Sequence, residues 1–158
     1  MKRLSWKYIA GLIDADGCID LQLIKDKKTG EYKYVRPRVR IGLSYPGFGI
    51  LALLHNSHGG NVHKRNFEGH KNHNPNWSEH RYWTLEGKRA RPFLQNIVGH
   101  MYIKREQARL AIYTIDHIMG KHVPDSVREH LRDEFKAMKS DPQRLSEKAV
   151  VEIQSLML

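Results

Sequence analysis

Cysteine is almost absent from this chain of 158 residues, which has a single thiol at Cys18. One cysteine cannot form an intrachain disulfide or a cysteine-based zinc cluster, so neither can stabilise the fold. No apolar run approaches the roughly 20 residues that a membrane-spanning helix needs. The basic N-terminus reaches acidic residues before the apolar core of a signal peptide is complete. We therefore expect an intracellular protein of the cytoplasm or an organelle matrix, without a membrane partner.

Acidic residues are also scarce, with 17 Asp and Glu against 27 Lys and Arg and a formal charge of +10. Such a charge favours a polyanionic partner, because each cation placed against a phosphate releases condensed counterions. Apolar residues make up 40% of the chain, which excludes a disordered protein. The length and the lack of a composition break predict one domain over residues 1–158.

Apolar periodicity predicts a mixed α+β fold. Pro37, within the second strand, favours an edge position or a bulge for that strand. The expected order is αββαββα with extra C-terminal helices over about 123–158. The expected elements are a helix over about 6–15, strands over 18–24 and 35–43, a helix over 48–57, strands over 61–66 and 79–85, helices over 90–98 and 104–119, and closing helices over 123–139 and 145–156.

Asp14 and Asp16 lie where the first helix runs into the first strand, just before Gly17. Acids at a helix C-terminus oppose the helix dipole, so helix stability does not account for them. Arginine-rich strand residues, where phosphates would lie, are expected beside them. A hard cation such as Mg²⁺ prefers one or two carboxylates together with phosphate oxygens and water. The junction therefore predicts metal-dependent phosphate chemistry; the alternative is an ordinary helix end.

The segment IAGLIDADG, residues 9–17, resembles the namesake motif of the LAGLIDADG homing endonucleases, with Ile in place of the first Leu. The motif occurs once. Single-motif members of that family are homodimers, in which the two motif helices pack together and one saddle-shaped antiparallel sheet covers double-stranded DNA. The resemblance implies a site-specific DNA endonuclease that cuts a long pseudo-palindromic site and leaves 3′ overhangs. It implies Mg²⁺ as the cofactor, with Mn²⁺ able to substitute.

The resemblance also assigns catalytic roles to residues. Asp16 is implied to be the metal-binding catalytic carboxylate, one from each subunit, with the Ala15 carbonyl as a supplementary ligand. Lys104 matches the basic residue that the family places near its active site, and Arg105 is the second choice.

Other positions follow from the same family pattern. Ser44 or Tyr45 is implied to position water, at a place where the family commonly has Gln. The small residues Ala10 and Gly11 are implied to lie in the dimer interface, and Asp14 to cap the motif helix of the partner.

The outward faces of the strands are predicted to contact DNA, because antiparallel strands can lie in the major groove. Arg36, Arg38 and Arg40 suit guanine or phosphates, whereas Asp20 and Gln22 suit cytosine and adenine. The alternative is a solvated sheet face. Further contacts are predicted for Lys64, Arg65, His80 and Arg81.

A polar stretch, EGHKNHNPNWS, contains His70 and His73. We expect it to be a loop that contacts the phosphate backbone rather than a histidine metal site. Two other functions remain open for the chain: an RNA maturase that assists splicing of its host intron, and a non-catalytic DNA-binding protein of the same fold. Asp16 favours the endonuclease, since a non-catalytic binder does not need an acid facing phosphate.

Overall fold

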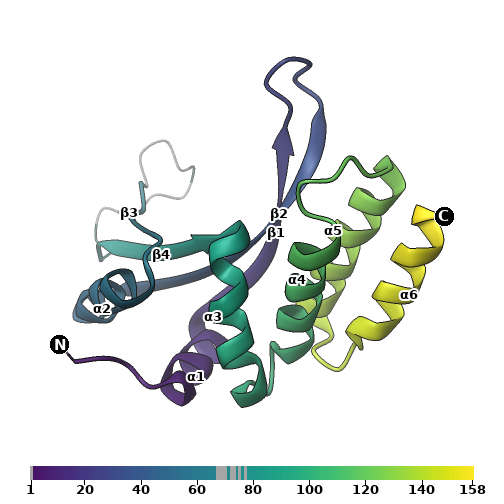
Figure 1. Cartoon of the computed structure of the whole chain (residues 1–158). Helices are drawn as coiled ribbons and strands as arrows, with labels where there is room; N and C mark the ends of the chain where they lie inside the picture. Colours follow the sequence, from purple (N-terminus) through teal and green to yellow (C-terminus); the bar gives the residue numbers. More distant parts are fainter. Residues whose placement is uncertain (1, 67–70, 72–73, 75, 77) are drawn as a thin grey trace.

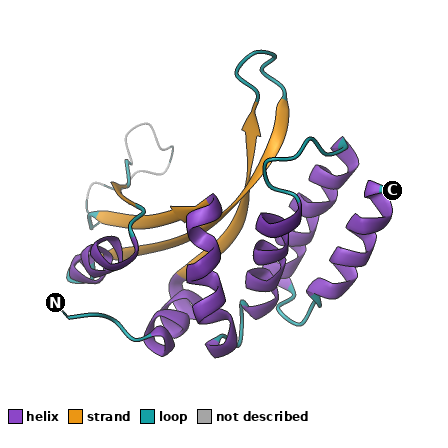
Figure 2. Cartoon of the chain, viewed as in Figure 1, coloured by secondary structure: helices purple, strands orange, loops and turns teal. Residues whose placement is uncertain are grey.

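The computed structural model describes residues 2–66, 71, 74, 76 and 78–158, so His70 and His73 lie outside the described residues. The predicted α+β class and the αββαββα order are confirmed (Figure 2). No described helix is both long enough and apolar enough to cross a membrane. The elements are α1 (Trp6–Asp16), β1 (Gly17–Lys25), β2 (Tyr32–Ser44), α2 (Phe48–His58), β3 (Asn61–Lys64), β4 (His80–Glu86), η1 (Gly87–Arg89), α3 (Ala90–Ile97), η2 (Val98–His100), α4 (Arg105–His117), α5 (Asp125–Ser140) and α6 (Ser146–Met157).

The strands form one antiparallel sheet in the order β1-β2-β4-β3. Strand β2 is therefore an interior strand, and the edge position that we expected from Pro37 is wrong. The pairing explains why proline is accepted there. The ladder between β2 and β4 starts only at Arg38, whereas β1 continues alongside β2 as far as Tyr32. Pro37 thus has a neighbouring strand on one side only, as an edge residue has.

The helices α1, α3, α4 and α5 lie on one side of the curved sheet (Figure 1). Alternation along the strands directs Ile19, Val39, Ile41, Trp83 and Leu85 towards these helices, and all five are buried. Full burial of each such side chain contributes roughly 1.5–3 kcal/mol. The intervening residues of β1 and β2 face away from the helices, which leaves a polar sheet face.

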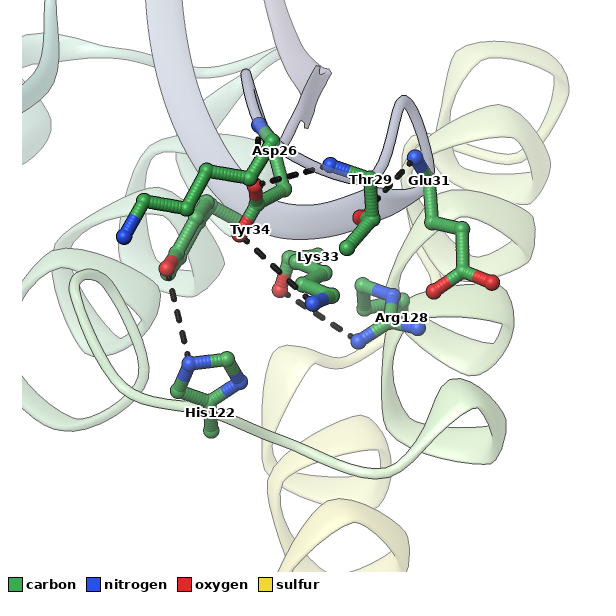
Figure 3. Close-up of polar contacts among 8 residues, drawn as sticks. Asp26, Thr29, Glu31, Lys33, Tyr34, His122 and Arg128 are labelled. Atoms are coloured by element: carbon green, nitrogen blue, oxygen red, sulfur yellow. Dashed lines mark hydrogen bonds and ion pairs between the residues drawn. The ribbon is translucent and has the colours of Figure 1, made fainter.

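The β1–β2 hairpin extends beyond the helical layer, and close to its turn β2 is fastened to the start of α5 (Figure 3). Arg128 donates hydrogen bonds from Nη1 to the carbonyls of Lys33 and Val123, at 3.3 and 2.7 Å. The Tyr34 hydroxyl lies 3.4 Å from Nε2 of His122. These contacts join the hairpin to the helical layer, so that it continues the sheet as a supported arm.

Two carboxylates fasten the C-terminal helices to one another. Glu106 of α4 accepts hydrogen bonds from the backbone N–H and the hydroxyl of Ser146, at 2.9 and 2.6 Å, and so caps the start of α6. Glu134 of α5, only 5% exposed, accepts two hydrogen bonds from Arg144 at 2.7 and 2.6 Å. The Arg144 guanidinium lowers the pKa of Glu134 below its ordinary value, although burial acts in the opposite direction.

Candidate active site

Helix α1 carries the acidic pair to the edge of the sheet. It starts after Ser5, whose hydroxyl accepts a hydrogen bond from the Tyr8 N–H at 3.2 Å. It ends at Asp16, and the Gly17 N–H donates to the Ile13 carbonyl. A Cβ on Gly17 would lie 2.7 Å from Cα of Ile13, so only glycine allows the chain to pass this closely from helix to strand.

The carboxylate of Asp14 is buried and fully engaged. It accepts hydrogen bonds from the backbone N–H groups of Tyr102, Ile103 and Lys104 at 2.7, 3.3 and 2.9 Å. These donors lie in the connection that leads into α4, whose N-cap is Lys104, and an anion is favourable near this end of the helix. We predicted that Asp14 caps the motif helix of the partner. That prediction is wrong, because the carboxylate caps α4 of its own chain.

Lys104 lies at the same end of α1 as Asp16. Its ammonium donates hydrogen bonds to the carbonyls of Ile13 and Asp14, at 3.0 and 2.5 Å. The last carbonyls of a helix lack partners within it, and a cation there also suits the helix dipole. Arg105 points elsewhere, since its Nε donates to a carbonyl of the η2–α4 connection at 2.8 Å. Lys104 is therefore the basic residue beside the acidic pair.

Asp16 is exposed, and within the described part of the chain its carboxylate has no hydrogen bond or ion pair. Its side chain opens onto a cavity of about 580 Å³ on the polar face of the sheet. Two arginines and a histidine line the same cavity, and among the described lining residues Asp16 is the acidic one. The other lining residues are Cys18, Arg40, Gly42, Arg65, His80 and Tyr82.

His80 occupies this cavity because Gly42 has no side chain. A Cβ on Gly42 would lie 2.4 Å from Nε2 of His80. Ser44 is opposite His80 in the β2–β4 register, and its Oγ lies 3.3 Å from Nδ1; the tautomer of the ring decides which atom donates. Tyr45 is exposed and places its ring edge-on to Phe48 instead. Of the two residues predicted to position water, only Ser44 thus contacts a side chain of the cavity.

An ion-pair cluster occupies the middle of the polar sheet face. Arg38 donates to both oxygens of Asp20, from Nε at 2.9 Å and from Nη2 at 2.8 Å, and Arg40 lies 3.6 Å away. Burial raises the pKa of Asp20, but the hydrogen bonds and charge of Arg38 outweigh it and leave the pKa below its ordinary value. Asp20 in turn raises the pKa of Arg38. Arg38 uses one acceptor site on each oxygen of Asp20, so this carboxylate orients an arginine, and the cytosine contact of Asp20 stays a prediction.

The sequence profile that describes LAGLIDADG endonucleases matches residues 9–78, which include most of α1 and its acidic pair. Over these residues the chain resembles the LAGLIDADG endonuclease family. The structure of the homing endonuclease I-CvuI with the I-CreI target and Mg is 24% identical, with a TM-score of 0.68 over 96% of this chain and 93% of that one. The archaeal intron-encoded homing endonuclease I-Vdi141I, complexed with DNA, is 15% identical, with a TM-score of 0.63 over 96% and 95%. These likenesses show a shared fold. No curated protein matches the chain significantly.

Helix α1, which carries the motif, has one face that the described part of its own chain leaves uncovered. Tyr8, Gly11 and Ala15 are exposed along it, at the spacing of one helix face, and a Cβ on Gly11 would meet nothing within 4 Å. Ala10 is fully buried in the core of its own chain. Gly11 therefore lies on a face that another helix can approach. The interface position predicted for Ala10 is wrong, because its side chain points inward.

At the β3–β4 end of the sheet, Arg81 and Lys64 lie on the opposite face from the one that we predicted. Arg81 lies on the same face of β4 as the buried Trp83, and its guanidinium covers the Phe48 ring at 4.4 Å. Lys64 is directly opposite Arg81 and shares that face. Both predicted DNA contacts thus lie on the helical side of the sheet, because the register places odd-numbered β4 residues there. The residues that face away from the helices at this end are His63 and Tyr82, whose ring centroids are 5.4 Å apart. The sequence pattern did not predict this pair.

Proposed function

We propose that the chain is a metal-dependent, site-specific DNA endonuclease of the homing type that works as a homodimer. One observation carries this proposal: Asp16, at the end of the motif helix, presents a carboxylate to a cavity lined by Arg40, Arg65 and His80, and that carboxylate has no partner among the described residues. An acid that faces cationic side chains without pairing with them is suited to share a cation with a phosphate. The similar proteins I-CvuI and I-Vdi141I have been solved with DNA, which supports DNA as the substrate.

Asp16 and the Ala15 carbonyl fit a hard divalent cation, because both are oxygen donors at an exposed helix end. One carboxylate per chain is few for such a cation, so Asp16 of each subunit would contribute. The Mg²⁺ or Mn²⁺ ions would neutralise charge on the phosphate and make the attacking water more acidic. The repulsion between two adjacent carboxylates would be relieved in the same step.

The remaining roles are assigned to side chains of the cavity and of the end of α1. Arg40 and Arg65 would bind the phosphate that enters the cavity, since guanidinium groups match phosphate oxygens. Lys104 would stabilise the charge that develops on the phosphate and on the leaving oxygen. His80, steadied by Ser44, would hold the attacking water and accept its proton, a task suited to imidazole at neutral pH. Asp14 is a positioning residue, because it fixes the start of α4 and thereby Lys104.

The homodimer would form through the uncovered face of α1. Pairing around Gly11 would bring the two Asp16 side chains together, since each lies at the end of the same helix. Each subunit would then cut one strand across the minor groove, and cuts staggered in this direction leave 3′ overhangs. A twofold protein matches a pseudo-palindromic DNA site.

The test combines cleavage with binding. Wild type and Asp16→Asn are incubated with a randomised duplex library and Mg²⁺, the new ends are sequenced, and retention on DNA is measured without metal. Wild type alone should recover one pseudo-palindromic site with 3′ overhangs, and both proteins should bind that site. Equal cutting by Asp16→Asn would overturn the role of the carboxylate. Binding by wild type without cutting, in Mg²⁺ and in Mn²⁺, would instead indicate a DNA-binding protein without nuclease activity.

A further inference from the structure

We propose that Arg38, held by Asp20, recognises a guanine in each half of the DNA site. This inference rests on the proposed function, because it needs DNA on the polar face of the sheet. It assigns Asp20 as a positioning residue, whose task is to orient the Arg38 guanidinium before DNA arrives.

The hydrogen-bond pattern of the pair determines which edge of Arg38 remains available. A guanidinium has five N–H donors in a fixed plane. Asp20 takes one from Nε and one from Nη2, at 2.9 and 2.8 Å. The Nη1–Nη2 edge is left, with parallel donors directed away from Asp20. That edge matches O6 and N7 of guanine, whereas adenine presents an N–H donor in place of O6.

Neighbouring arginines on the same face are held less firmly. The side chain of Arg38 is 20% exposed, whereas Arg36 and Arg40 are 44% and 39% exposed. Arg36 makes one contact with Glu86, at 3.3 Å. A side chain that is already ordered loses less conformational entropy when it binds, and its geometry discriminates better between bases.

Charge also favours a base over a phosphate as the target of Arg38. The Arg38–Asp20 pair is neutral as a unit, so it gains little from a phosphate and releases few counterions. The oriented Nη1–Nη2 edge of Arg38 can still distinguish bases, because the geometry of its hydrogen bonds, and not net charge, provides the selectivity. Arg40 and Arg65, which line the cavity beside Asp16, remain the phosphate ligands.

The register places the guanine relative to the cut. Gly17 is opposite Ile41, and Asp20 is opposite Arg38, three residues further along both strands. At about 3.3 Å per residue, Arg38 is roughly 10 Å from the end of α1. One base step is about 3.4 Å, so the guanine lies about three base pairs outward from the catalytic end. Twofold symmetry predicts the same base in the other half-site.

The experiment is a binding selection from a randomised duplex library without Mg²⁺, so that cleavage does not affect the result. Wild type should prefer G·C over A·T at one position of each half-site, by about tenfold or more. Arg38→Gln should lose this preference or shift it to adenine, and Arg38→Lys should lose it while keeping the charge. Glu79→Gln, which frees Arg81 on the helical side of the sheet, is the matched control and should leave that position unchanged.

Asp20→Asn tests the positioning role. It should reduce the preference for guanine to roughly twofold and make binding more dependent on salt by about one phosphate contact, because it frees a cation. A purely structural role would lower affinity for every sequence alike and would not change the salt dependence in this direction. Thermal unfolding of each variant identifies any that does not fold. If Asp20→Asn does not fold, Arg38→Lys still tests whether Arg38 recognises guanine.

The outcomes separate this inference from the proposed function. If wild type selects and cuts a site whose bases do not respond to Arg38 substitutions, the inference is overturned and the nuclease assignment stands. Unchanged guanine preference in Asp20→Asn, with unchanged salt dependence, overturns the positioning role. If wild type selects and cuts no sequence, the proposed function fails, and the inference fails with it.

Discussion

The end of α1 and the α5–α6 pair use carboxylates in opposite ways. Between α5 and α6, Glu134 is buried and receives two hydrogen bonds from Arg144. His130 and Glu152 bring further ligand atoms within 4.8 Å of it, but Arg144 already occupies both oxygens, which disfavours a metal there. At the end of α1, Asp16 is exposed and unpaired within the described residues. A carboxylate that stabilises this fold is saturated, whereas the one available for chemistry is left open.

The same contrast recurs within two residues of α1. At 3.6 residues per turn, Asp14 and Asp16 are about 200° apart around the helix and point to opposite sides. Asp14 points towards the start of α4 and is saturated by backbone N–H groups. Asp16 points towards the cavity on the sheet face. One short motif therefore supplies one saturated acid and one open acid.

The largest effect should come from the open carboxylate. Asp16→Asn should slow cleavage by at least roughly 10³-fold, because metal-ion catalysis contributes several kcal/mol. Stability should stay the same or rise, since removal of a charge from the C-terminal end of α1 relieves repulsion with the helix dipole. Single-turnover cleavage of a selected site measures the rate. Asp133→Asn, which changes a well-exposed acid on α5, is the control and should cut like wild type. A similar loss in the control would contradict the distinction.

Lys104→Met should give the next largest effect, a cleavage rate lower by roughly 10²-fold, as expected on removal of one group that stabilises developing charge. Of the two carbonyls that Lys104 covers, that of Ile13 keeps the Gly17 N–H as a donor, so the fold should persist, which thermal unfolding of the variant checks. Arg105→Met is the paired variant and should retain most activity. If Arg105→Met were the more damaging change, Arg105 would take the assigned role.

Asp14→Asn tests the saturated acid of α1. The variant removes a charge-assisted cap from α4, and caps contribute about 0.5–2 kcal/mol, so the free energy of unfolding should fall by that amount. Cleavage should also slow, because Lys104 loses its fixed position. Urea unfolding measures the first effect, and single-turnover cleavage of the folded variant measures the second. Full activity in a destabilised variant would show that the cap does not position Lys104.

Glu134→Gln should have the smallest effect, a loss of about 1–2 kcal/mol in unfolding free energy at pH 7 with unchanged cleavage. The pKa of Glu134 is lower in the folded chain than in the unfolded chain, so its contribution is present above the ordinary pKa of glutamate. That contribution disappears as the pH falls through the folded-state value. Denaturant titrations at pH 7 and in acid should therefore show the difference from wild type shrinking in acid. A difference independent of pH would exclude the ion pair as its source.

Features set by neighbouring residues in the sequence, such as helix bounds and strand alternation, were predictable. Helix α1 was expected over about residues 6–15 and ends at Asp16, and the outward direction of Arg36, Arg38 and Arg40 followed from a period of two. Long-range partners were not predictable in this way. The contact of Asp14 with Tyr102 spans 88 positions, and no spacing rule identifies it.

The register between neighbouring strands was also not predictable from the sequence. Lys64 and Arg81 were assigned to the DNA face, but strand alternation alone does not say which parity faces outward, and a short strand such as β3 has too few apolar residues to decide it. His80 required the same information, since only its pairing with Ser44 brings it into the cavity. Ala10 was ambiguous because a small side chain fits a packed core as well as a helix–helix contact.

The vacancy above Gly42 has a consequence for attempts to retarget this protein by directed evolution. Any side chain introduced at position 42 would push the His80 ring out of the cavity, because its Cβ would lie 2.4 Å from Nε2. Libraries that vary position 42 alone would mostly return inactive clones, whatever new base they recognise. Positions 42 and 80 should instead be randomised together, as one linked codon pair, so that each new residue at 42 is screened with a compatible partner.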